Sequence, residues 1–133
     1  MARPRKEADF DRRDELREAL VFYRRREVMD LPEQEGAIDR LSRHRLWSMS
    51  QIGSIIGRTR AFVARRMDKS DMTGGKFNPQ TIPDLLELIE LKDRGEEPAE
   101  LMRKISDAGT SGYMISRLTG IPLSTVTYKI KRG

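Results

Sequence analysis

Two stretches of the chain concentrate arginine and lysine, and phosphate binding is the chemistry that such side chains favour. Residues 43–69 hold seven basic side chains and one acidic side chain, and residues 101–133 hold six basic side chains and one acidic side chain. The intervening residues 70–100 hold three basic and eight acidic side chains. Because basic side chains neutralise a phosphate backbone, this alternation predicts two surfaces that bind a polyanion, separated by a segment that does not.

Other reactive side chains are few. The 133 residues include no cysteine and one histidine, His44, for which we expect a surface position or a phosphate contact. The sequence has no glycine-rich phosphate loop, metal-ligand cluster or nucleophile with a partner base, so we expect no enzyme activity, cofactor or metal. No apolar run approaches the roughly 20 residues that span a bilayer. We therefore expect a cytoplasmic protein with no membrane partner and no small-molecule substrate.

The second basic stretch contains a pattern of helix, glycine and helix. In "GYMISRLTGIPLSTVTYKIK", Ile115 and Leu118 precede Gly120, and Val126 and Ile130 follow it. This spacing predicts two short helices that bury their apolar residues together, joined by a turn at a glycine that tolerates positive φ. The polar residues between the buried positions are then expected to point outward.

The first basic stretch repeats this pattern. Ile52, Gly57 and Val63 each lie 63 residues before Ile115, Gly120 and Val126, and Gly53 takes the small-residue position of Ser116. The shared spacing predicts two copies of one architecture.

Both segments resemble the helix-turn-helix of bacterial and phage repressors, most closely in "ISRLTGIPLSTVTYKI". The resemblance implies that the second helix of each pair enters the major groove of DNA. The implied base-reading residues are Thr59, Arg60, Ala61, Ala64 and Arg65 in the first pair, and Leu123, Ser124, Thr127, Tyr128 and Lys131 in the second. Phosphate contacts are expected from Arg43, Arg45, Arg58, Arg66, Lys69, Arg117, Lys129 and Arg132. Arg3, Arg5 and Lys6 form either an arm that enters the minor groove or a disordered end.

Apolar residues at helical spacing predict an all-α fold. We expect helices over 8–29, 33–46, 51–56, 60–67, 82–95, 99–108, 112–119 and 123–131. The domains predicted from them are a helix-turn-helix domain with a long leading helix over 1–70, a linker over 71–80 that forms a wing or a loop, and a second helix-turn-helix domain over 81–133. Helices 33–46 and 99–108 are expected to complete the two cores, which leaves helix 82–95 as a spacer.

The tandem layout is similar to that of immunity repressors of temperate actinobacteriophages. That resemblance implies a repressor of phage lytic genes in the bacterial host, close to the nucleoid. Because the two reader sets differ, we expect a monomer that binds an asymmetric operator on double-stranded DNA, with a dimer as the alternative. The other functions left open are a phage or plasmid DNA-architectural factor, such as an excisionase or packaging subunit, and a protein-interaction module that docks on polymerase.

Overall fold

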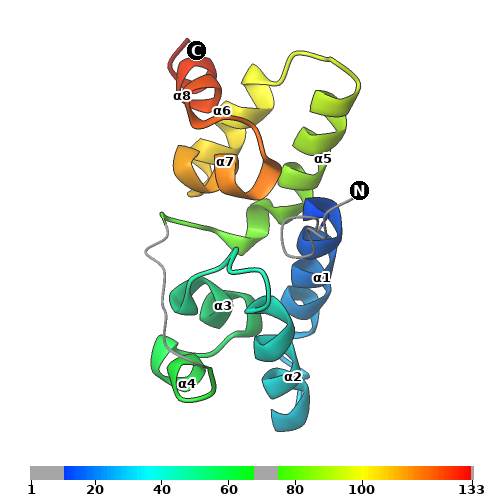
Figure 1. The fold of residues 1–133 in the computed structure, drawn as a ribbon, viewed down its shortest axis with the longest axis vertical. Coiled ribbons are helices and arrows are strands. Elements are labelled where there is room, and N and C mark those ends of the chain that lie inside the picture. The colour runs from blue at the N-terminus through cyan, green and yellow to red at the C-terminus, as the bar shows by residue number, and fades with distance from the viewer. Residues whose placement is uncertain (1–10, 68–74, 133) are drawn as a thin grey trace, which may run out of the picture.

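A computed structural model describes residues 11–67 and 75–132, and within these ranges the fold is all-α (Figure 1). This confirms the predicted fold class. The helices of the described residues are α1 (Arg12–Arg25), α2 (Leu31–Leu41), α3 (Met49–Ile56), α4 (Arg60–Ala64), the 3-10 turn η2 (Pro79–Thr81), α5 (Ile82–Asp93), α6 (Ala99–Asp107), α7 (Gly112–Thr119) and α8 (Leu123–Arg132).

Short polar side chains begin several of these helices by accepting hydrogen bonds from otherwise unpaired backbone N–H groups. Asp11 caps α1 and Asp30 caps α2. Ser48 caps α3 in a reciprocal arrangement, because its hydroxyl accepts from the Gln51 N–H while the Gln51 side chain accepts from the Ser48 N–H. Thr59 caps α4 by accepting from the N–H of Phe62 at 3.1 Å. Local sequence therefore sets where these helices begin.

One apolar core runs through the described chain. It includes Leu16 of α1, Ile52 of α3, Leu85 of α5 and Ile115 of α7, each fully buried. Trp47 is also buried and packs against Phe77, with ring centroids 5.1 Å apart and ring planes tilted by 55°.

Helix α1 contacts α2, α3, α5 and α7, and so connects the two halves of the chain. Helix α5 packs against α1, α6 and α7. An ion pair between Arg13 of α1 and Asp93 of α5 joins these helices further. The helix that the sequence left over as a spacer therefore packs its apolar face against three neighbours.

Several predicted boundaries differ from the observed ones. The long first helix ends at Arg25, so Val28 lies beyond it and is 70% exposed. The second helix ends at Leu41, and Leu46 in the following loop is buried. The fourth helix ends at Ala64, three residues before the predicted end.

Two polar side chains make contacts inside the fold. Thr81 makes no capping hydrogen bond to α5; its hydroxyl donates to the Asn78 carbonyl at 2.7 Å and lies 2.7 Å from the Thr110 hydroxyl. His44 was expected at the surface or on phosphate, but it lies against the buried carboxylate of Glu15 at 3.6 Å. Burial raises the pKa of Glu15, and the nearby His44 opposes this rise.

Candidate nucleic-acid interface

Two helix pairs in the fold share their length, caps and turn. Helices α3 and α7 each have eight residues, begin after a capping serine (Ser48 and Ser111) and end at a left-handed glycine (Gly57 and Gly120). The φ angles of the two glycines are 79° and 83°. All of these positions, and the starts of α4 and α8, are separated by the 63-residue offset found in the sequence. The structure thus places equivalent residues at equivalent points of the two pairs.

The small residue inside each first helix faces the turn that follows. A Cβ added to Gly53 would lie 2.6 Å from the Arg58 carbonyl oxygen, which is too close for an unshifted side chain. At the equivalent position, the hydroxyl of Ser116 donates to the Ile121 carbonyl at 2.6 Å. Arg58 and Ile121 are themselves 63 residues apart. Equivalent carbonyl groups therefore approach the two helices. In α7 the Ser116 side chain fits because its hydroxyl donates to this carbonyl.

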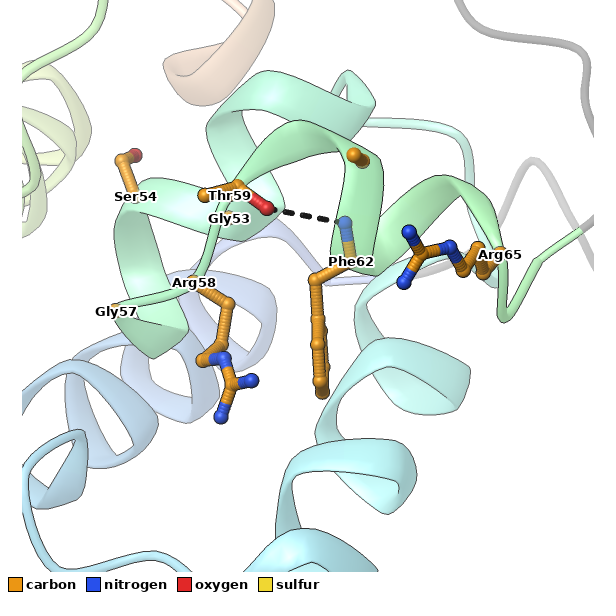
Figure 2. A pocket seen from close by; sticks show the side chains of 8 residues that line it. Gly53, Ser54, Gly57, Arg58, Thr59, Phe62 and Arg65 are labelled. Atoms are coloured by element: carbon orange, nitrogen blue, oxygen red, sulfur yellow. Dashed lines mark hydrogen bonds between the residues drawn. The ribbon is translucent and has the colours of Figure 1, made fainter.

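In the first pair, the predicted reader residues lie on the surface. Thr59, Arg60, Ala61 and Arg65 are exposed and Ala64 is half-buried, while Val63 is fully buried. Figure 2 shows the Thr59 hydroxyl bonded to the Phe62 N–H, and Arg65 at the far end of the helix from this turn. The turn lines a shallow hollow formed by Gly53, Ser54, Gly57, Arg58, Thr59, Ala61, Phe62 and Arg65. Helix α4 therefore offers solvent a small, positively charged face.

In the second pair, the predicted readers are also exposed. They are Leu123, Ser124, Thr127, Tyr128 and Lys131, and the exposed fractions of Leu123 and Tyr128 are 46% and 57%. Val126 is fully buried beneath them, and Ile130 packs against the core. Helix α8 thus shows solvent a face of hydroxyl, aromatic and aliphatic groups with one lysine. The two faces differ in chemistry although their scaffolds correspond.

Arg58 and Arg66, both predicted phosphate contacts, are held in place by Phe62. The guanidinium carbon of each lies 3.8 Å from the centre of the Phe62 ring. Two guanidinium groups this close to one centroid must lie on opposite faces of the ring, because like charges on one face would overlap and repel. Figure 2 shows Arg58 beside the ring. These cation–π contacts fix two positive charges beside α4.

Acidic and polar side chains of α2 complete this arrangement. Arg58 donates to the Gln34 side-chain oxygen at 3.2 Å, and Arg66 pairs with Glu35 at 3.2 Å. The sequence analysis missed Gln34, Glu35 and Phe62. The sequence signal for Phe62 was an aromatic residue with an arginine four residues before it and another four residues after it, although both arginines lie outside α4.

Three other predicted phosphate contacts, Arg43, Arg117 and Lys129, already have partners within the protein. Lys129 pairs with Glu97 at 2.9 Å, and this contact lowers the pKa of Glu97. Arg43 lies 3.5 Å from Asp39. Arg117 donates to the Arg45 carbonyl at 2.5 Å. To bind phosphate, Lys129 must leave Glu97 or contact both groups. This competition reduces the affinity that Lys129 can add to phosphate binding.

Some predicted residues lie outside the described part of the chain. They are Arg3, Arg5, Lys6, Lys69 and the side chain of Arg132. The choice between a wing and a loop for residues 68–80 also stays open, because only its second half is described; there, residues 75–78 are irregular and lead into η2.

Within the described residues, no group of three or more His, Cys, Asp or Glu side chains could hold a metal ion. In the same part of the chain, no helix has the length and apolar character needed to cross a membrane. Comparisons of the chain with protein-family models, curated proteins and solved structures found no match.

Proposed function

We propose that the protein binds double-stranded DNA sequence-specifically, with α4 and α8 in the major groove. The observation that carries this proposal is the correspondence of the two helix pairs, each of which exposes the side chains of its second helix and buries the apolar ones. At about 1.5 Å per residue, α8 is roughly 15 Å long and α4 roughly half that. A major groove about 12 Å wide admits a helix. Each second helix therefore has the form required to contact base edges.

The two faces are proposed to read different bases. Arg60 and Arg65 on α4 suit guanine, since a guanidinium donates two hydrogen bonds to its O6 and N7. On α8, Thr127 and Tyr128 supply hydroxyl groups that donate or accept, and the exposed Leu123 suits contact with a thymine methyl group. Arg58 and Arg66, fixed on Phe62, are proposed to meet phosphates beside α4.

In this proposal, one chain occupies one operator and represses transcription by blocking polymerase, as an immunity repressor does. A protein with this role acts in the bacterial cytoplasm at the nucleoid. The two unlike faces favour a monomer on a site with unlike halves, whereas a symmetric dimer would need each face twice.

Selection of bound sites from random duplexes tests the proposal. We expect the wild-type protein to select one consensus with two parts. Joint substitution of Arg60 and Arg65 by Ala should erase preference in one part, and joint substitution of Thr127 and Tyr128 by Ala should erase it in the other. If either pair weakens binding equally on all sequences, the residues are not base readers.

A second candidate function is docking on another protein such as polymerase. The exposure of Leu123 and Tyr128 favours it, because large apolar side chains at a surface often mark protein contacts. Salt dependence distinguishes the two functions. If six to ten phosphates are contacted, affinity falls by about 10³- to 10⁵-fold between 50 and 200 mM salt. A response that stays nearly flat would favour protein docking and count against DNA binding.

A further inference from the structure

The correspondence between the two halves extends beyond the turns. Helices α1 to α4 and α5 to α8 occur in the same order, and α3 starts 63 residues before α7 just as α4 starts 63 before α8. Several contacts inside the halves also correspond: α1 contacts α2 and α3 as α5 contacts α6 and α7, and α2 contacts α3 as α6 contacts α7. The two halves therefore share a four-helix order and much of their packing, although α8 packs on α6 more closely than α4 packs on α2.

Where the two units meet, equivalent parts touch each other. Helix α1 packs against α5, its own counterpart. The side-chain nitrogen of Gln51 lies 3.3 Å from the sulfur of Met114, and these residues are counterparts at the 63-residue offset. In a twofold interface a residue near the axis meets its own copy, whereas in a head-to-tail interface it meets a different residue. Both contacts join a part of one unit to its counterpart in the other, as in a twofold interface.

The arrangement in space agrees with this. Figure 1 shows α4 and α8 at opposite ends of the long axis of the molecule, with α3 and α7 between them. The symmetry is approximate, since the loop before α3 is longer than the loop before α7 and α1 also contacts α7. The contacts between counterparts and this placement of α4 and α8 are those that a local twofold axis between α3 and α7 would produce.

We infer from this geometry, and on the basis of the proposed function, that the operator consists of two inverted half-sites with different sequences. A twofold axis between the units turns α8 by half a rotation relative to α4. The two second helices then run in opposite directions along the duplex and read opposite strands, as the subunits of a symmetric dimer do. Direct repeats would instead require the two units to be related by a translation.

The 63-residue offset also pairs the readers. Arg60 corresponds to Leu123, and Ala61 corresponds to Ser124. Ala64 corresponds to Thr127, and Arg65 corresponds to Tyr128. All four of these α8 positions are exposed. Exchanging their side chains therefore changes the reading face and leaves the core intact.

Grafting one reading face onto the other unit tests the inference. The variant L123R/S124A/T127A/Y128R places the four α4 side chains of Arg60, Ala61, Ala64 and Arg65 at their counterpart positions in α8. Site selection with this variant should yield a palindrome of the α4 half-site, while the wild type yields two unlike halves. The reciprocal variant R60L/A61S/A64T/R65Y should yield a palindrome of the α8 half-site. Thermal unfolding of each variant verifies that it folds as the wild type does.

The outcomes separate the inference from the proposed function. A direct repeat of the grafted half-site would overturn the inverted arrangement while leaving DNA binding in place. The same conclusion would follow if each variant selected a consensus with only one copy of the grafted half-site. A wild-type protein that selects no sequence would overturn the proposed function itself.

Discussion

Replacing the turn glycine Gly57 by alanine tests the geometry on which both helix pairs depend. Gly57 has a φ of 79°, a left-handed conformation that costs an L-residue about 1–2 kcal/mol. The nearest atom to an added Cβ would be the Arg26 Cβ at 3.5 Å, an ordinary contact. The loss therefore comes from the backbone alone, and we expect Gly57→Ala to lower the free energy of unfolding by about 1–2 kcal/mol.

Gly36 provides the matched control. It lies inside α2, and an added Cβ there would meet nothing within 4 Å. Gly36→Ala should therefore raise the free energy of unfolding by about 0.5–1 kcal/mol, because alanine is favoured in a helix interior. Urea unfolding measures both changes, and with an m-value of about 2 kcal/mol/M the Gly57→Ala midpoint should fall by roughly 0.5–1 M. The reasoning fails if Gly57→Ala is as stable as the wild type while Gly36→Ala behaves as expected.

Further predictions address a buried charge, the helix caps and the charges near α4. Glu15→Gln should stabilise the protein at pH 7, because burial raises the pKa of the carboxyl and so disfavours the buried carboxylate. The native wild type binds this proton at higher pH than the unfolded chain does, so the stability of the wild type relative to Glu15→Gln improves as pH falls. Urea midpoints at pH 7 and pH 4 measure this, and a constant difference between the two proteins would contradict it. Ser48→Ala and Ser111→Ala should each cost about 1 kcal/mol, because each removes one hydroxyl that accepts from a backbone N–H, and the N–H of residue 48 keeps its bond to Gln51; a change near zero in thermal unfolding for either variant would speak against that. Glu35→Gln should raise affinity for all duplexes by up to about fivefold, the value of an exposed ion pair, because it releases Arg66; a sequence-dependent gain in a binding titration would show that Arg66 does more than contact phosphate.

Local signals in the sequence predicted much of the helical structure. Thr59 begins α4, and Gly57 and Gly120 end α3 and α7, as their side chains or lack of them require. The apolar spacing around the two glycines placed Ile52 and Ile115 in the core, where both are fully buried. Such features act over a few residues, and a linear pattern is enough to reveal them.

The partners of the candidate site residues could not be predicted in this way. Arg58 reaches Gln34, 24 residues away, and Lys129 reaches Glu97, 32 residues away. The sequence pattern offered many possible carboxylates and amides for each of these basic side chains. Which of them lies close enough depends on how the helices pack.

The amino-acid sequence alone specified an all-helical chain, the two glycine turns and the 63-residue repeat, because capping, backbone strain at positive φ and helical periodicity are properties of neighbouring residues. The packing of α5 on α1, the contact of Gln51 with Met114 and the hydrogen bond from Arg58 to Gln34 were decided only by the tertiary structure. These contacts join segments far apart in the chain, and apolar faces that could pack in several ways acquire one set of neighbours only when the whole core forms.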